Sequence, residues 1–459
     1  MPGWSDRVRF AGGDKGFAYA PGRVLVKTVE LTAARDLLGL SAPDGQTPTV
    51  GSYSVLPVSG EVPSVVASLR GAGLTAQPDY VYFLDAAPNA DAAGNPVYAS
   101  PVYASPVYAS GADPHATAHC RDTNPCTCEP PASASSLVYP HPIFAKLRYT
   151  PQGALRYQMT GTRPSQAKPL YGVQAPGPTD AGWATTGVVR IAVVDTGWPA
   201  SGALATVALA TVASTSEGDF IDAPDAEFDG YLDPVAGHGT FIAGLLAQRA
   251  PDCAVAVFHA LSTYGDGAES AIATCIQDLA CRPSETRPHF LSLSFGTYTP
   301  DDEEPGVLRE AIQHAILKGI IVVASAGNDG TSRRSYPAAF PGVVSVGALG
   351  PSGPASFSNW GDWVRACAPG VDVSSSFWFF NGAQQAKFGA DADDYHGWAL
   401  WSGTSFAAPI VTAALADAVH HGVPIKEVVS RTIDYPGLYR IPCYGTVVNP
   451  PIKQLGKLP

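Results

Sequence analysis

The chain has little charge, no basic cluster and no long apolar run, and these absences narrow what it can be. Only 15% of its 459 residues are charged, with a net charge of −12. Because no segment gathers lysine and arginine, we expect no nucleic-acid partner. Nowhere do about 18 apolar residues follow one another, so we expect no membrane span. The first ten residues lack the apolar core of a secretory signal, which predicts a cytoplasmic protein or one exported by a non-standard route.

Cysteine is also scarce, with eight residues in the whole chain. This is too few for a disulfide-dense scaffold, and the redox compartment stays open. Cys120, Cys126 and Cys128 follow His119 in a proline-rich stretch, but their spacing matches no common structural-zinc pattern. We expect free thiols or one local disulfide there rather than a metal.

What the chain does have is a series of segments with different compositions. Residues 1–85 predict a small α+β domain in the order strand, helix, strand, helix, strand. The strands are expected at 23–27, 53–58 and 80–84, and the helices at 31–40 and 62–74. A unit of about 60 residues is near the lower limit of independent stability, so we expect it to pack against a partner surface.

Residues 86–170 are rich in alanine, proline and serine, and they contain Pro-Val-Tyr-Ala-Ser three times in tandem at 96–110. Such a composition cannot bury enough apolar surface to offset its ordering entropy, which predicts an extended linker. The repeat is a candidate docking segment or cleavage site.

Residues 171–445 predict a doubly wound α/β domain, with a parallel sheet covered by helices on both faces. A C-terminal tail is predicted at 446–459. The apolar runs lie at 188–194, 254–261, 290–295, 320–324 and 343–346, and helical stretches lie at 239–249, 267–281 and 306–318. In such a sheet the ligand site lies beyond the carboxyl ends of the strands.

Two candidate residues lie at ends of these elements. Asp195 closes the first apolar run, although an aspartate there is equally consistent with an Asx turn or a helix cap. His238, between two glycines, opens a helix of small residues, and alone it would be taken for a structural histidine.

Two further candidates follow later in the chain. Ser405 precedes another helix of small residues, where its own N–H would point toward an oxyanion, although a serine there is usually an N-cap. Asn328 follows the strand at 320–324, where its amide could donate to a developing negative charge. Read alone, it is a turn asparagine.

The four candidates occur along the chain in the order Asp, His, Asn, Ser. The Asp, His and Ser of this series follow in the chain order of the subtilisin triad, which favours a common function for them. The chain resembles the subtilase family in four signature blocks, with Gly-Thr-Ser-x-Ala-x-Pro at 403–409 as the most distinctive. The other three blocks lie at 193–197, 237–240 and 326–328, and shorter likenesses at 292–296, 336–338, 357–359 and 368–370 extend the resemblance over roughly residues 170–420. Residues 22–85 are similar in pattern to the family's inhibitory propeptides.

The resemblance implies a serine endopeptidase that is made as a self-inhibited zymogen and acts on polypeptides. Ser405 would be the nucleophile, His238 the general base and Asp195 the residue that orients the imidazole. Asn328 and the Ser405 N–H would form the oxyanion hole. The substrate would lie extended between 294–296 and 264–267. The implied substrate-binding residues are Ser294, Phe295, Gly296, Ala326, Gly327 and Ser335, with Asp329 at the pocket rim and Arg333 and Arg334 close by.

No cofactor is required by the chemistry that the resemblance implies. Several subtilases bind calcium, and acidic residues cluster at 222–233 and at Asp391, Asp393 and Asp394. Neither group is spaced like a recognised calcium loop, so calcium stays possible but a solvated acidic surface is the preferred interpretation.

Two other functions are compatible with parts of this pattern. A catalytically silent binding protein could keep the fold, although the presence of all four chemical residues argues against it. Alternatively, residues 1–170 could be a regulatory module that chiefly binds a partner.

Overall fold

The computed structural model describes residues 7–12, 16–41, 47–84, 188–197, 210–212, 235–350, 353–381 and 394–448. The predicted linker at 86–170, the cysteine cluster within it and the acidic run at 222–233 lie outside these described residues, as do Asp391, Asp393 and most of the predicted tail.

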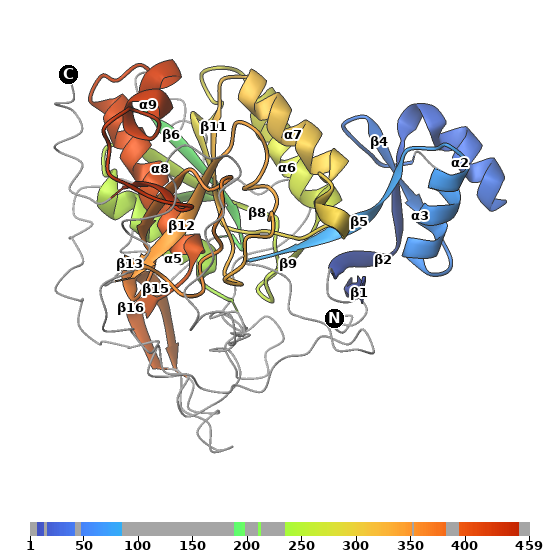
Figure 1. The fold of residues 1–459 in the computed structure, drawn as a ribbon, viewed down its shortest axis with the longest axis horizontal. Coiled ribbons are helices and arrows are strands. Elements are labelled where there is room, and N and C mark those ends of the chain that lie inside the picture. The colour runs from blue at the N-terminus through green and yellow to red at the C-terminus, as the bar shows by residue number, and fades with distance from the viewer. Residues whose placement is uncertain are drawn as a thin grey trace.

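Residues 7–84 form a small α+β unit, at the blue end of the chain in Figure 1. The strands are β1 (Arg9–Ala11), β2 (Phe17–Lys27), β3 (Thr49–Val50), β4 (Tyr53–Pro57) and β5 (Ala76–Phe83); the helices are η2 (Thr28–Glu30), α2 (Leu31–Leu38) and α3 (Val62–Gly71). The predicted order of strand, helix, strand, helix, strand is confirmed, with β1 and β3 as additions. Helix α2 ends at Gly39, whose left-handed φ of 64° is the usual C-terminal cap.

The body of the protein is built on a ten-stranded sheet. Its order is β17-β18-β14-β12-β11-β10-β6-β8-β7, with β13 beside β12, and all neighbours are parallel except the pairs of β12 with β13 and β17 with β18. The strands are β6 (Arg190–Asp195), β7 (Ala210–Val212), β8 (Ala254–His259), β10 (Phe290–Leu293), β11 (Ile321–Ser325), β12 (Val344–Gly350), β13 (Gly353–Pro354), β14 (Ala366–Pro369), β17 (Arg440–Ile441) and β18 (Gly445–Val447). The strand order reverses at β6, so the carboxyl end of β6 is where a ligand site is expected.

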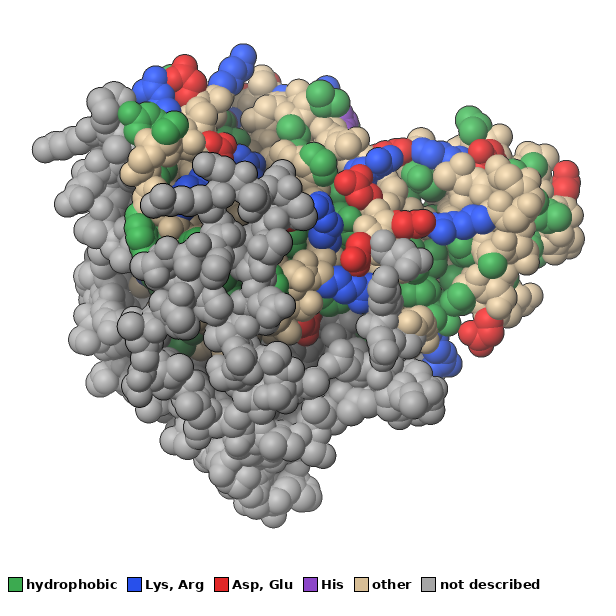
Figure 2. Space-filling view, in the orientation of Figure 1, with side chains coloured by type: hydrophobic (Ala, Val, Ile, Leu, Met, Phe, Trp, Pro, Cys, Tyr) green, Lys and Arg blue, Asp and Glu red, His purple; other side chains and the backbone are tan. Residues whose placement is uncertain are grey.

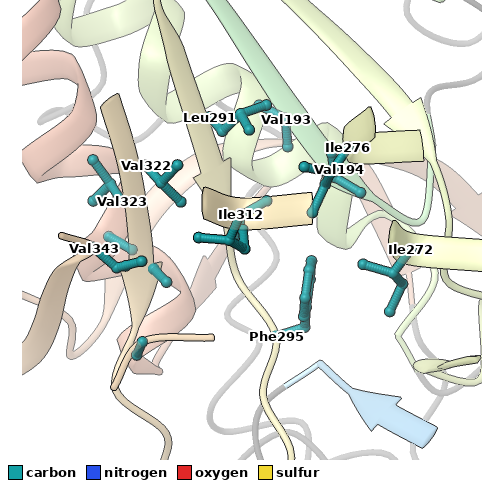
Figure 3. Packing of buried hydrophobic residues seen from close by; sticks show 14 of the residues in the cluster. Val193, Val194, Ile272, Ile276, Leu291, Phe295, Ile312, Val322, Val323 and Val343 are labelled. Atoms are coloured by element: carbon teal, nitrogen blue, oxygen red, sulfur yellow. The ribbon is translucent and has the colours of Figure 1, made fainter. Parts of the chain in front are cut away.

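Helices cover both faces of this sheet, which confirms the predicted doubly wound α/β fold (Figure 1). Helices α5 (His238–Arg249) and α8 (Thr404–His420) pack on one face, and α6 (Glu269–Cys281) and α7 (Gly306–Leu317) on the other. Figure 3 shows Ile272 and Ile276 of α6 and Ile312 of α7 packed toward the strand residues Val194 and Leu291.

The remaining elements lie around this core. They are the short helices η3 (Pro300–Asp302) and α9 (Ile425–Thr432), the strand β9 (Asp266–Ala268), and the hairpin of β15 (Val373–Asn381) and β16 (Asp394–Trp401). Within the described part of the chain, no helix is long and apolar enough to span a bilayer. Cys253, Cys275, Cys281 and Cys367 are free thiols, and Cys443 is disulfide-bonded.

Strand β5 joins the two parts of the molecule. It belongs to the sheet of the small unit and also pairs antiparallel with β9 of the body, so that one sheet runs across the junction (Figure 1). In the space-filling view, positive and negative side chains lie side by side along this junction (Figure 2). The partner surface that the small unit was expected to need is therefore the body of the same chain.

Candidate active site

The carboxylate of Asp195 and the imidazole of His238 form a buried pair. Asp195 is the last residue of β6 and His238 the first of α5, and neither side chain is exposed. The His238 Nδ1 lies 2.8 Å from Oδ1 and 3.0 Å from Oδ2 of Asp195. When Nδ1–H donates to this carboxylate, a neutral imidazole has its lone pair on Nε2. This Nε2 is buried and has no hydrogen-bond partner among the described residues.

Backbone contacts between β6 and α5 hold this pair together. The Gly239 N–H donates to Thr196 Oγ1 at 3.0 Å, and the Thr196 N–H donates to Asp195 Oδ1 at 2.8 Å. A Cβ added at Gly239 would lie 2.5 Å from the Gly197 carbonyl oxygen. The glycine beside His238 therefore allows the helix to begin against the end of the strand.

Aromatic rings surround the imidazole. The ring centroids of Trp401 and Phe406 lie 5.5 Å and 5.4 Å from that of His238, and all three side chains are fully buried. Burial also lowers the pKa of His259, which pairs with Asp195 across β6 and β8, to about 4. With this lowered pKa, the second imidazole is neutral near pH 7.

Ser405 lies in the first turn of α8, but it does not cap that helix. The N-cap position belongs to Gly403, and no side chain makes a capping hydrogen bond there. The N-cap interpretation of Ser405 is therefore wrong. The Ser405 hydroxyl instead donates to the carbonyl oxygen of Ser294 at 3.0 Å.

Pro409 explains how the start of α8 is tied to β10. A proline has no N–H, so the carbonyl of Ser405, four residues earlier, has no helical donor at this position. The Ser294 hydroxyl supplies one, at 2.9 Å from the Ser405 carbonyl oxygen. Ser405 and Ser294 are thus joined by two reciprocal hydrogen bonds.

Asn328 is fixed next to the same helix start. Its Oδ1 accepts the N–H of Thr404 at 2.8 Å, and the Thr404 hydroxyl accepts the N–H of Gly327 at 3.1 Å. Since Oδ1 faces a donor, the assignment of oxygen and nitrogen in this amide is unambiguous. The NH₂ group of Asn328 is the end that can donate to a substrate oxygen near Ser405.

The residues predicted to bind substrate lie beside these groups. Phe295 and Ser335 are fully buried, and Ser335 Oγ has no hydrogen-bond partner among the described residues. A Cβ added at Gly296 would lie 2.4 Å from Ser335 Oγ, and one at Gly327 would lie 3.7 Å from it. The hydroxyl of Ser335 therefore lies between two backbone segments, those of Gly296 and Gly327.

The charged residues near this pocket are engaged with one another. Tyr298 donates to Asp329 Oδ2 at 2.7 Å, and burial raises the pKa of Asp329 to about 6. Arg333 lies over the Tyr298 ring and pairs with Asp302 at 2.8 Å. Arg334 is half exposed and lies 3.8 Å from Asp362.

One contributor was not recognised as part of the site from the sequence. Asn359 donates to the carbonyl of Ala326 at 2.8 Å, and its Oδ1 accepts the N–H groups of Asp329 and Thr331. This amide holds the turn that carries Asn328. The only sequence signal was its place in the family-like segment at 357–359.

Both backbone edges predicted for substrate are occupied by the chain's own strand β5. Phe83 exchanges two hydrogen bonds with Gly296, at 3.0 Å and 2.8 Å, and the Leu84 N–H donates to the Gly265 carbonyl at 2.9 Å. Tyr82 lies opposite Gly267 in the pairing with β9. An extended segment therefore lies between Gly296 and residues 265–268.

No group of three or more metal-ligating side chains occurs within the described ranges. Asp394 begins β16, and the other acidic residues considered for calcium lie outside those ranges.

A carboxylate, an imidazole, a hydroxyl and an amide gathered at the carboxyl ends of parallel strands define an α/β protein with a hydrolase-like site. Residues 186–427, slightly more than half of the chain, match the model of the subtilase family, Peptidase_S8. The chain belongs to the subtilase family.

Individual relatives agree with this assignment. The thermophilic serine proteinase of Bacillus sp. (strain AK1) is 33% identical over 211 residues, which cover 43% of this chain and 47% of that protein. Subtilisin Savinase of Lederbergia lenta is 30% identical over 254 residues, covering 53% of this chain and 80% of that protein. The chain thus spans about half the length of the first of these relatives.

A solved structure also aligns with the chain. A cold adapted subtilisin-like serine proteinase aligns with a TM-score of 0.43 and 24% identity, over 57% of this chain and 87% of that one, a likeness too weak to support any further conclusion.

Proposed function

We propose that the chain is a serine endopeptidase that hydrolyses peptide bonds through an acyl-enzyme. The observation that carries this proposal is the buried pair of Asp195 and His238, whose Nε2 has no hydrogen-bond partner among the described residues and whose ring packs against Phe406, the residue after Ser405. A lone pair on a buried imidazole next to a serine hydroxyl is what a general base needs.

In the proposed reaction the hydroxyl of Ser405 attacks the scissile carbonyl. His238 Nε2 takes the hydroxyl proton and returns it to the leaving amine. Asp195 stabilises the imidazolium that forms, through the two contacts at Nδ1. Water then releases the acyl group by the same steps in reverse, so no metal or cofactor is required.

The negative charge that develops on the substrate oxygen would be met by two donors. One is the NH₂ group of Asn328, whose other end is fixed by Thr404. The second is the backbone N–H of Ser405, which lies in the first turn of α8. A single preorganised donor of this kind is worth about 3 kcal/mol.

We also propose that residues 7–84 inhibit the enzyme from within the same chain. Support comes from β5, which lies between the two edges that a substrate would use. A substrate strand would make the same main-chain hydrogen bonds, so the two must compete.

Two polar side chains of β5 support a stable docked state. Asp79 of β5 accepts the backbone N–H and the hydroxyl of Ser270, at 3.0 Å and 2.8 Å, at the N-terminus of α6. Gln77 accepts the first N–H of α7, from Gly306, at 2.8 Å, and donates to Glu269 at 2.7 Å. Both helix N-termini are thus satisfied in part by the small unit.

The test uses the full-length chain and two serine variants. Ser405→Ala is expected to abolish both hydrolysis of a fluorogenic peptide and self-processing. Ser402→Ala is the matched control, since Ser402 is also buried but its hydroxyl accepts the N–H of Asp372 and it lies outside helix α8.

Sequencing of the N-terminus after incubation gives a second measurement. A new N-terminus between residues 86 and 180 is expected in the wild type and in Ser402→Ala only. Unchanged hydrolysis by Ser405→Ala would overturn the proposed role of Ser405. Processing that continues in that variant would show that another enzyme makes the cut.

A further inference from the structure

The cleft recognises β5 through its backbone and one side chain. Tyr82 is fully buried, and its ring stands edge-on to Phe295 at 5.9 Å. The carbonyl of Val81 accepts the Thr297 hydroxyl at 2.8 Å, and Val81 pairs with Ala268. The body therefore binds the dipeptide Val-Tyr by holding the backbone on both sides and enclosing the tyrosine.

The neighbouring side chains of β5 are covered by the small unit rather than by the body. Phe83 and Val81 form a separate apolar cluster with Val8 and Phe10, and the Phe10 and Phe83 rings stack at 6.2 Å. A different peptide in the cleft would have no need of a large side chain after its tyrosine. The body itself therefore selects a tyrosine side chain, and it also binds the backbone carbonyl of the residue before that tyrosine.

The same dipeptide occurs three times in the tandem repeat. Pro-Val-Tyr-Ala-Ser at 96–110 places Val-Tyr at 97–98, 102–103 and 107–108. We propose that the cleft around Phe295 and Thr297 is a docking site for this repeat, which enters when β5 leaves. The inference rests on the proposed function, because it takes this cleft to be the one in which the enzyme binds its peptide substrates.

Alignment through the tyrosine predicts how the repeat would bind. Alanine takes the place of Phe83, which fits the lack of a pocket there. Proline takes the place of Tyr80, whose backbone N–H bonds to Glu269 in the docked state. Because proline has no N–H, the repeat binds more weakly than β5. The repeat is therefore expected to bind in the cleft only after β5 has left it, and not to displace β5.

The register also predicts that bound repeats resist cleavage. Phe83 lies opposite Gly296, so in an antiparallel pair the residue two positions further along a bound peptide lies opposite Ser294. In the first two repeats that residue is the proline of the next repeat, which cannot donate an N–H to the Ser294 carbonyl. These repeats would occupy the cleft as inhibitors more readily than as substrates.

The chain is long enough for this exchange. From Leu84 to Val97 there are 13 steps (97 minus 84), which reach about 45 Å when extended. From Ser110 to Val188 there are 78 more (188 minus 110), so the repeat can enter the cleft without moving β6.

The test follows amide hydrogen exchange at Gly296 in the uncut full-length chain. Ser405→Ala prevents cleavage, Tyr82→Ala weakens β5, and Tyr139→Ala removes a further Val-Tyr pair. In this background the amide should stay protected. Adding Tyr98→Ala, Tyr103→Ala and Tyr108→Ala should speed its exchange about 10-fold or more. The matched control adds Tyr435→Ala and Tyr439→Ala, two exposed tyrosines of the body, and should change nothing.

Rescue by a peptide guards against a folding defect in the triple variant. Pro-Val-Tyr-Ala-Ser-Pro-Val-Tyr-Ala-Ser added to that variant should restore protection at Gly296, whereas the peptide with both tyrosines replaced by alanine should not. Equal exchange with and without the repeat tyrosines, or equal effects of the two peptides, would overturn the inference.

The readout does not depend on catalysis, so the two proposals fail separately. If the wild type hydrolyses peptides but exchange at Gly296 does not depend on the repeat tyrosines, the proposed activity stands and the docking proposal is overturned. If exchange depends on those tyrosines but no hydrolysis occurs, the docking proposal stands and the proposed activity is overturned.

Discussion

Two substitutions at Tyr82 should change the docking of β5 in opposite directions. The ring of Tyr82 is buried against Phe295, yet its hydroxyl has no hydrogen-bond partner among the described residues. Tyr82→Ala removes the ring and should weaken docking by about 3–5 kcal/mol, as for other buried aromatic residues. Tyr82→Phe removes only the unsatisfied hydroxyl and should strengthen docking by about 1–3 kcal/mol.

Hydrogen exchange at the amides of β5 measures this directly. In the Ser405→Ala chain the N–H groups of Phe83 and Leu84 are protected by Gly296 and Gly265 only while β5 is docked. At about 1.4 kcal/mol per factor of ten, Tyr82→Ala should speed their exchange by roughly 10²–10⁴. Tyr82→Phe should slow it by roughly 5-fold to 100-fold, and Tyr439→Ala, at an exposed tyrosine, should leave it unchanged.

Either of two results would refute the reasoning. Faster exchange in Tyr82→Phe would mean that the hydroxyl stabilises the docked state through a partner. Unchanged exchange in Tyr82→Ala would mean that the ring does not hold the strand.

Three further predictions concern the site and its surroundings. Asn328→Ala should lower kcat about 10²- to 10³-fold with little change in KM, as measured with a fluorogenic peptide, because only the transition state gains this donor. Burial raises the pKa of Asp329 to about 6, so the native state holds this proton more tightly than the unfolded state does. Its stabilising effect is present below about pH 4 and is lost as pH rises through 6; urea unfolding of the wild type relative to Asp329→Asn should show a loss of up to about 3 kcal/mol over that range. Among the four free thiols of the described residues, Cys281 is exposed, whereas burial raises the pKa of Cys275 to about 12, so peptide mass analysis should find that iodoacetamide at pH 8 modifies Cys281 before Cys275.

Much of the fold could be predicted because its elements have strong local patterns. The buried strands β8 and β10 are continuous apolar runs, and α3 and α7 carry clear helical periods. Boundaries were less accurate. Strand β5 begins at Ala76 rather than at Tyr80, because its first half contains the polar residues Gln77 and Asp79, whose burial depends on the helices that they contact.

Elements that depend on distant partners could not be predicted. The hairpin of β15 and β16 and the short strand β1 form against surfaces that no local pattern specifies. The same holds for Trp401, which encloses His238 from a strand far away in the chain.

The candidate site shows the same division. Its four chemical residues were found through their order and their signature blocks, although each had a plausible structural explanation alone. For Ser405 the structure removes that explanation, since Gly403 is the N-cap and the serine hydroxyl bonds to Ser294. The supporting role of Asn359 could not be predicted from the sequence, because its amide holds a turn 30 residues away and such a contact leaves no local sequence pattern.

The central claim is that His238 activates Ser405 as a nucleophile, and covalent labelling tests it most directly. Wild-type protein, incubated until processing is complete, is treated with a fluorophosphonate, and the labelled peptide is identified by mass spectrometry. The adduct is expected on Ser405 in the wild type and in Ser402→Ala, and on no residue in Ser405→Ala or His238→Ala. A label on another residue, or equal labelling of Ser405 without His238, would contradict the claim.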